Sequence, residues 1–219
     1  MKRILLLGLF LGIGVQLFAQ GIDFKPVPFS EALRMAKTQH KMLFVDCYTS
    51  WCGPCRYMAD SIFTRKETGD YFNKRFISVK YDIEKDEAKE FNALYTVGSF
   101  PTFWIFSPQG EVIYRMGGAS LTVKEWLRRM DVAVEEGTKL EKLRQNYRKN
   151  KNEKNTQAYL EAMGNIQFGE GISELFLEQF RETSDKIDFL YQHKNFLTKH
   201  LSPVHFEKFR KALKFFVML

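Results

Sequence analysis

The sequence has 219 residues, of which 45% are apolar and 15% aromatic, so it has enough material for a folded core and is not a disordered chain. This length allows one domain with an extension, or two small domains. The formal net charge is +7, and part of the excess lies between Lys139 and Lys154. Nucleic-acid binding needs basic residues clustered on one face or interleaved with aromatic ones, whereas most Lys and Arg here are mixed with Glu. We therefore expect solvated helical surfaces and no nucleic-acid partner.

The first twenty residues have the pattern of a secretory signal peptide. Lys2 and Arg3 precede an apolar stretch over 4–18, and Ala19 follows it. The stretch has about 15 residues, fewer than the roughly 20 that span a bilayer. We predict that residues 1–20 are a signal peptide cleaved after Ala19, with an uncleaved membrane anchor as the alternative. The protein is accordingly expected to be exported to the periplasm, or tethered to the membrane if the segment is not cut.

Strand and helix patterns alternate from residue 24 to about residue 136. Apolar residues, in runs or alternating with polar ones, predict strands at 41–47, 76–82, 102–106 and 112–115, and 24–27 is a candidate for a short first strand. Apolar residues at helical spacing predict helices at 29–40, from 52 past 62, at 86–95 and at 122–135, and a short helical turn at 71–72. A turn at 107–110 joins the last two strands as a hairpin. This order predicts a mixed sheet covered by helices.

The character of the sequence changes after residue 137. Residues 146–155 are polar and charged and are predicted to be a linker or loop. Only helical patterns follow, at 159–163, 175–180, 187–201 and 206–217, and Pro203 is expected to begin the last helix. We therefore divide the chain into a domain at 21–137 and an all-helical extension at 138–219. The apolar end at 215–219 is expected to pack against another surface, and a protein partner is one candidate.

The motif Trp51-Cys52-Gly53-Pro54-Cys55 directly follows the apolar run at 42–45. Two cysteines separated by two residues can close a small disulfide ring or be reduced to a dithiol. Where a strand gives way to a helix, the first thiol meets unpaired backbone N–H groups and the positive end of the helix dipole, and both favour the reactive thiolate. The pair is therefore predicted to be redox-active. A half zinc site is the alternative, but it lacks a second Cys or His pair, since the four histidines are scattered.

Three cysteines are an odd number for an exported protein, and the pairing of Cys52 with Cys55 leaves Cys47 over. A disulfide scaffold would need more cysteines spread more widely. Cys47 follows Asp46 in a predicted strand, so its side chain should point to the opposite face of the sheet. It is expected to act as a small buried apolar residue, with a regulatory thiol as the alternative.

Residues 46–55 (DCYTSWCGPC) and the downstream Phe100-Pro101-Thr102 resemble the thioredoxin superfamily. The resemblance covers about residues 24–136, and the spacing after the cysteine pair is similar to that of exported thioredoxin-like modules, including the C-terminal domain of the transmembrane disulfide reductase. It implies an α/β thioredoxin fold, a central mixed sheet flanked by helices, followed here by a helical C-terminal extension. The last residues, about eighty of them, have no counterpart in the family.

The resemblance also implies roles for four residues. Cys52 would attack a substrate disulfide to form a mixed disulfide, and Cys55 would resolve it and release the reduced product. Asp46, six residues before Cys52, matches the family's buried acid, whose raised pKa lets it accept the proton of Cys55. Lys80 matches the lysine beside this acid. From the residues alone, Asp46 could instead end a strand in a turn, and Lys80 could simply face solvent.

In the family, the loop before a cis proline faces the cysteines and pairs with the incoming peptide like an added strand, so Pro101 is expected to be cis. Phe100, just before it, departs from the smaller residue that the family often has there. Gly53 and Pro54 are expected to shape the ring and its redox potential. Trp51 is expected to shape the substrate groove, with an aromatic lid on the core as the alternative.

Together these features predict a thiol–disulfide oxidoreductase that acts on protein disulfides without a metal or an organic cofactor. Gly-Pro between the cysteines resembles reducing thioredoxins, so we expect a reductase supplied by an electron donor in the membrane. The alternative direction is oxidation of substrate thiols, because an oxidising compartment can run the same chemistry in reverse. The alternative is an adaptor, in which the thioredoxin-like domain binds peptides and the helical extension recruits a partner.

Overall fold

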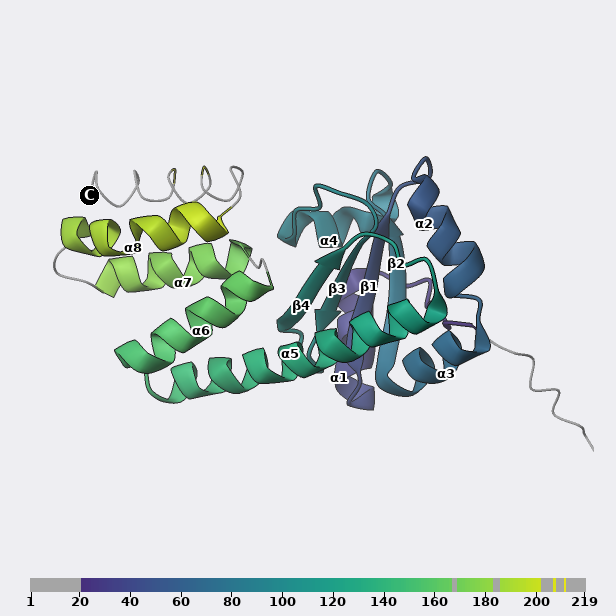
Figure 1. Cartoon of the computed structure of the whole chain (residues 1–219), viewed down its shortest axis with the longest axis horizontal. Helices are drawn as coiled ribbons and strands as arrows, with labels where there is room; N and C mark the ends of the chain where they lie inside the picture. Colours follow the sequence, from purple (N-terminus) through teal and green to yellow (C-terminus); the bar gives the residue numbers. More distant parts are fainter. Residues whose placement is uncertain (1–20, 167–168, 183–185, 202–206, 208–210, 212–219) are drawn as a thin grey trace, which may run out of the picture.

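The computed structural model describes residues 21–166, 169–182, 186–201, 207 and 211. The predicted signal peptide at 1–20 lies outside the described residues, as does nearly all of the predicted last helix, with Pro203 and the apolar end at 215–219. The described part forms an α/β domain built on one sheet and an all-helical extension beside it (Figure 1).

Four strands form the central sheet: β1 Met42–Tyr48, β2 Phe76–Asp82, β3 Thr102–Phe106 and β4 Val112–Gly117. Their order is β2-β1-β3-β4; β1 and β2 are parallel, whereas β3 pairs antiparallel with both β1 and β4. The predicted mixed sheet is therefore confirmed. The predicted first strand at 24–27 is wrong, because it is reduced to one bridge between Phe24 and Ser78. Pro26 and Pro28 lack the N–H groups that a longer ladder would need.

Helices cover both faces of the sheet. One face packs against α1 Phe29–Gln39 and α4 Lys89–Leu94, which a 3-10 turn (Asp86–Ala88) precedes. The other face packs against the π-helical turn Met58–Ile62 that continues α2 Gly53–Tyr57, against α3 Lys66–Arg75, and against the first half of α5 Val123–Lys149. Successive residues of β1 point to opposite faces, so Leu43, Val45 and Cys47 join the first layer and Phe44 joins the second.

Two helices differ from their predictions. The helix expected from the cysteine motif onward changes at Met58 to π-helical hydrogen bonding, in which the Phe63 amide donates to the Met58 carbonyl at 2.9 Å. The short turn expected at 71–72 is the ten-residue helix α3. Phe72 is fully buried there, and its ring lies against Phe44. Phe72 thus anchors a helix whose sequence is mostly polar.

Helix α5 continues without a break through residue 137, where the sequence-based domain boundary lies. Gly137 fits because it is buried against Ile113, whose side chain would lie 3.1 Å from an added Cβ atom. The loop predicted at 146–155 is wrong for most of its length, since only three residues separate α5 from α6 Glu153–Asn165. The polar residues of this stretch lie on exposed helix surfaces, while Tyr147 is buried.

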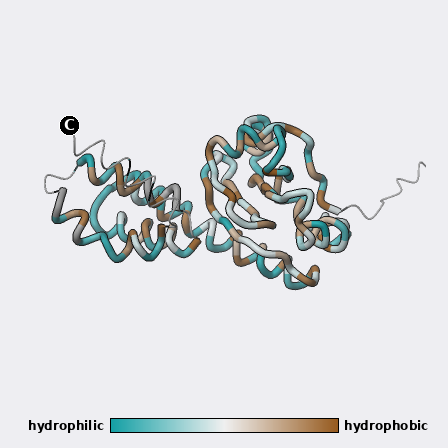
Figure 2. The backbone as a smooth tube through the Cα atoms, turned by 90° about the horizontal axis from the view of Figure 1, so that it is seen from above, coloured by the Kyte–Doolittle hydropathy of each residue, from teal (hydrophilic) through white to brown (hydrophobic). Residues whose placement is uncertain are grey.

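The extension continues the core of the domain. After α6 come α7 Gly169–Glu182 and α8 Lys186–His200, each packed against the helix before it (Figure 1). One cluster of buried apolar residues runs from the α1 face of the sheet through Leu140 to Tyr159 and Phe176. Figure 2 shows hydrophilic and hydrophobic positions alternating along the helices of the extension, as in amphipathic helices. Among the described residues, no helix is both long and apolar enough to cross a membrane.

A buried arginine links the extension to the sheet through hydrogen bonds. Nε of Arg144 in α5 donates to the Tyr159 hydroxyl of α6 at 2.9 Å. The same guanidinium donates to the Val112 carbonyl of β4 and to the carboxylate of Glu141. Strand β4, helix α5 and helix α6 therefore meet at one hydrogen-bonded centre.

Candidate active site

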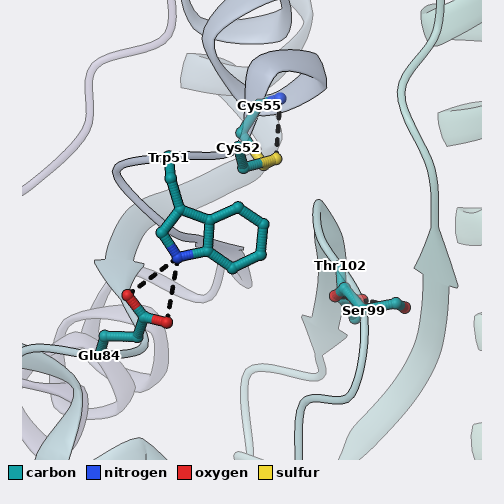
Figure 3. The surroundings of a disulfide bond; sticks show 6 residues. All are labelled: Trp51, Cys52, Cys55, Glu84, Ser99 and Thr102. Carbon is teal, nitrogen blue, oxygen red and sulfur yellow. Dashed lines mark hydrogen bonds between the residues drawn. A yellow bond between two sulfur atoms is a disulfide. The ribbon is translucent and has the colours of Figure 1, made fainter.

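The cysteine pair lies between the end of β1 and the start of α2. Cys52 and Cys55 form a disulfide with their Cα atoms 5.3 Å apart, and they are 3% and 6% exposed. Cys52 is the N-cap of α2, and its Sγ accepts a hydrogen bond from the Cys55 amide at 3.2 Å (Figure 3). In the reduced protein the same N–H would stabilise a Cys52 thiolate, the species that attacks disulfides. Gly53 and Pro54 are exposed in the first turn, where proline is tolerated because the first helical N–H groups have no partner within the helix.

Asp46 is buried in β1, six residues before Cys52. It is 5% exposed, and no described residue donates a hydrogen bond to its Oδ1. Burial raises the pKa of Asp46 from 3.8 to about 7, although the positive charge of Lys80 opposes the shift. Side-chain alternation puts Asp46 on the same face as Phe44, the face that the continuation of α2 covers. Asp46 is therefore a carboxyl group that can take up or release a proton near neutral pH.

Lys80 stands opposite Asp46 in the parallel pairing of β2 with β1, so the two residues share a face of the sheet. Its side chain is exposed, unlike those of the other residues of β2, and its Nζ lies 5.6 Å from the centre of the Phe24 ring. The structure thus brings the predicted acid and lysine together, with the lysine on the solvent side.

The neighbouring Cys47 points the other way, into the layer beneath α1 and α4. It is fully buried, as predicted, and burial raises the pKa of its thiol well above the usual range. Such a thiol stays protonated and is a poor nucleophile. Across the part of the chain that the structure describes, no three His, Cys, Asp or Glu side chains come together as metal ligands would.

The peptide bond between Phe100 and Pro101 is cis, as predicted. Thr102 Oγ1 donates to the Ser99 carbonyl at 2.7 Å and closes the turn around this bond (Figure 3). Phe100 is half-buried, and its ring stands edge-on to that of Trp51, with the ring centres 5.8 Å apart. The loop that carries the cis proline therefore touches Trp51, the residue next to Cys52.

Trp51 also has a polar partner. It is 64% exposed, and its Nε1 donates to both carboxylate oxygens of Glu84 at 3.1 Å (Figure 3). Glu84 follows β2, whose C-terminal end lies beside that of β1 because the two strands are parallel. Sequence reasoning missed Glu84, although an indole N–H at the end of one parallel strand points to an acceptor at the end of its neighbour. Trp51 is thus an exposed side chain next to Cys52, held between Glu84 and Phe100, and it does not cover the core.

Exposed apolar side chains lie next to Cys52 and at the end of α2. Trp51, Tyr57 and Leu121 are among the few large apolar residues that are strongly exposed in the described part of the chain. Tyr57 ends α2, and its hydroxyl donates to the Leu121 carbonyl at 2.7 Å. We call these three residues and the half-buried Phe100 the apolar rim. Exposed apolar surface of this kind is typical of a binding site for other chains.

The domain matches a family model described as a thioredoxin-like domain over residues 29–133. A thioredoxin-like protein of Synechocystis sp. is 32% identical over 90 residues, which are 41% of this chain and 80% of that protein. Thioredoxin H2 of Arabidopsis thaliana is 35% identical over 118 residues, which are 49% of this chain and 83% of that protein. Thioredoxin-2 of Pyricularia oryzae is 37% identical over 93 residues, but the match spans 42% of this chain and only 47% of that protein.

A solved structure of a candidate disulphide isomerase from Bacteroides thetaiotaomicron is 41% identical, covers 54% of this chain and 97% of its own, and has a TM-score of 0.48. The family match ends within α5 and leaves the helical extension outside it. The matched domain carries the paired cysteines of a thiol–disulfide oxidoreductase. The chain belongs to the thioredoxin-like family.

Proposed function

We propose that the chain is an exported enzyme that reduces disulfide bonds in proteins through Cys52 and Cys55. The observation that carries this proposal is the position of Cys52. Its Sγ receives the Cys55 amide hydrogen at the start of α2, and the adjacent Trp51 contacts Phe100 of the cis-proline loop. A nucleophile therefore stands beside a peptide backbone that can pair with an extended substrate.

In the reductive cycle, the Cys52 thiolate attacks one sulfur of the substrate disulfide, and the other substrate sulfur leaves as a thiolate. The Asp46 carboxylate takes the proton of Cys55, whose thiolate then attacks the Cys52 sulfur of the mixed disulfide. The second substrate sulfur leaves, the Cys52–Cys55 disulfide closes, and two electrons have passed to the substrate. A pKa of about 7 at Asp46 gives access to both of its protonation states at neutral pH.

Segments of unfolded or extended protein are the substrates that suit this site. The apolar rim offers contacts to the apolar side chains that such segments expose. Backbone pairing at the cis-proline loop does not depend on the substrate's sequence, so it admits many proteins.

The direction of electron flow and the location of the protein are proposed from the sequence. Gly53-Pro54 is the pair that resembles reducing thioredoxins, and residues 1–20 have the signal-peptide pattern. An exported reductase works in an oxidising compartment and must receive its electrons from elsewhere. We therefore propose a membrane protein as its electron donor.

Insulin reduction by dithiothreitol tests the proposal, since wild type should accelerate the reaction and Cys52→Ser should not. Cys55→Ser keeps the nucleophile but not the resolving thiol. It should accumulate a mixed disulfide with its substrate, which mass spectrometry can identify. A reduction potential of roughly −270 mV would support a reductase, whereas one near roughly −120 mV, as in strong oxidants, would reject that direction.

An adaptor role is the second candidate. It is favoured by the helical extension, which lies outside the family match yet shares its buried core with the domain. The extension would then bind a partner protein, and the domain would recognise peptides without turnover. Equal insulin-reduction rates for wild type and Cys52→Ser would favour the adaptor over the enzyme.

A further inference from the structure

Residues 117–121, which comprise the end of β4 and most of its connection to α5, touch both halves of the site. The amide of Gly118 donates to the carbonyl of the cis proline, Pro101, at 2.9 Å. The hydroxyl of Tyr57, at the end of α2, donates to the carbonyl of Leu121 at 2.7 Å. This connection therefore joins the cis-proline loop to the helix that begins at the cysteine pair.

Arg129 of α5 holds the connection in place. Its Nη2 donates to the Gly117 carbonyl at 2.7 Å, and its Nη1 donates to the Gly118 carbonyl and to Ser120 Oγ, both at 2.9 Å. Ser120 is fully buried, and its amide also contacts Sδ of Met58 at 3.2 Å. Burial lowers the pKa of Arg129, but an arginine side chain remains charged in proteins. One cation thus supplies three charge-assisted hydrogen bonds to a short segment.

The connection needs this support because its backbone is irregular. Residues 118–122 form neither helix nor strand, and Gly118 has a φ of 84°, in the left-handed region that favours glycine. Without Arg129, two carbonyl groups and the buried Ser120 hydroxyl lose this donor. A shift of the segment would reach Pro101 through the Gly118 amide and Tyr57 through the Leu121 carbonyl.

We propose that Arg129 is a positioning residue for thiol–disulfide exchange with protein substrates, an inference that rests on the proposed function. It acts through residues 117–121, which hold the cis-proline backbone and the cysteine helix at a fixed separation. A protein substrate must contact both elements, whereas a small disulfide needs only Cys52. Arg129 therefore matters for protein disulfides and much less for small ones.

The test compares Arg129→Met with Arg128→Met, which removes an exposed arginine one position earlier in the same helix. In Arg129→Met, KM for insulin should rise roughly tenfold, which corresponds to about 1.4 kcal/mol of lost substrate binding, while kcat changes by less than about twofold. The rate with 5,5′-dithiobis(2-nitrobenzoic acid), a small disulfide, should stay near that of wild type. Arg128→Met should match wild type in both assays. A wild-type KM for insulin in Arg129→Met, or an equal loss with both disulfides, would overturn the inference.

Two further measurements decide the matter if Arg129→Met is poorly folded. Arg129→Lys keeps the charge and can reach one of the acceptors, so its KM should fall between those of wild type and Arg129→Met. Amide hydrogen exchange at residues 117–121 should accelerate by roughly tenfold or more in Arg129→Met but not in Arg128→Met, and unchanged exchange would refute the positioning role. Hydrogen exchange needs no substrate. If wild type fails to reduce insulin, the proposed function is rejected, but hydrogen exchange still tests whether Arg129 holds residues 117–121 in place.

Discussion

Two regions of the molecule bury polar side chains in different ways. One is the face of the sheet that carries Asp46, here called the catalytic face, and the other is the junction with the extension, centred on Arg144. On the catalytic face, Asp46 is buried with one carboxyl oxygen that receives no hydrogen bond from the described residues. At the junction, Arg144 is equally buried, but each of its three guanidinium nitrogens donates a hydrogen bond. Burial places the pKa of Asp46 near neutral pH, whereas Arg144 uses its hydrogen bonds to join β4, α5 and α6. Burial therefore tunes the proton affinity of Asp46 on the catalytic face, whereas at the junction the buried Arg144 attaches the extension to the domain.

The largest effect is expected for Asp46→Asn. The folded pKa of about 7 exceeds the usual 3.8, so the unfolded chain ionises first and the free energy of unfolding falls as pH rises from about 4 to about 7. Above pH 7 the ionised carboxylate lowers that free energy by up to about 4 kcal/mol. Asp46→Asn removes this penalty, so it should be more stable than wild type by a similar amount at pH 8. Urea unfolding at pH 4 and pH 8 measures the difference.

The same variant should reduce insulin more slowly, because it has no carboxylate to take the proton of Cys55. Asp60→Asn is a matched control, since Asp60 is exposed, and its free energy of unfolding should equal that of wild type at both pH values. If wild type and Asp46→Asn were equally stable at pH 8, the buried ionised carboxylate would not lower the free energy of unfolding, and the contrast with Arg144 would fail.

At the junction, the strongest disruption is expected from Arg144→Met. The change removes a buried donor from the Val112 carbonyl and the Tyr159 hydroxyl, so the free energy of unfolding should fall by about 2 to 4 kcal/mol. All three tryptophans lie in the thioredoxin-like domain, so their fluorescence reports on the domain, while far-UV circular dichroism also reports on the extension. In urea the two transitions should coincide for wild type and separate for the variant, with the helical signal lost first.

Arg148→Met is the matched control for the junction, because Arg148 is 58% exposed and pairs with Glu111 at 2.7 Å on the surface. Exposed pairs of this kind contribute about 0 to 1 kcal/mol, so the transitions should still coincide. Both variants should still reduce insulin. Coincident and unshifted transitions in Arg144→Met would show that the extension does not depend on this arginine.

A smaller effect is expected for Cys47→Ala, which removes one buried sulfur from the layer beneath α1 and should lower the free energy of unfolding by about 1 kcal/mol. Insulin reduction should be unchanged, because Cys47 faces away from Asp46. In the oxidised wild type, a thiol reagent should find no reactive group in the folded protein and one after unfolding, since Cys47 is the free cysteine. Rapid labelling of the folded protein would instead support a regulatory thiol.

Features that depend on neighbouring residues follow from the sequence alone. The predicted strand at 76–82 has the bounds of β2, because the alternation of apolar and polar residues over 77–82 can be recognised locally. The junction of strand and helix at Cys52 follows from the short cysteine motif, whose residues are adjacent in the chain. The cis bond before Pro101 is instead implied by the resemblance to the thioredoxin superfamily, and the structure confirms it.

Features that depend on contacts between distant segments do not follow from local patterns. A domain boundary is predicted at residue 137, yet α5 continues through Gly137, which packs against Ile113. Arg129 and Glu84 are ordinary charged residues in the sequence, and each gains a specific partner only when other elements are in place. The polar residues that hold the site in place, such as Arg129 and Glu84, therefore cannot be predicted from short sequence motifs.

The smallest effect, and the most local test of the catalytic face, is expected for Glu84→Ala. The change removes the acceptor of the Trp51 indole N–H. Because Trp51 is 64% exposed, the stability should hardly change, but the ring can turn away from Phe100 and KM for insulin should rise about two- to threefold. Glu84→Gln keeps an acceptor and should match wild type. The nuclear magnetic resonance signal of the Trp51 indole proton should move upfield only in Glu84→Ala; if neither signal nor KM moved, Phe100 alone would orient the ring and the apolar rim would need no polar support.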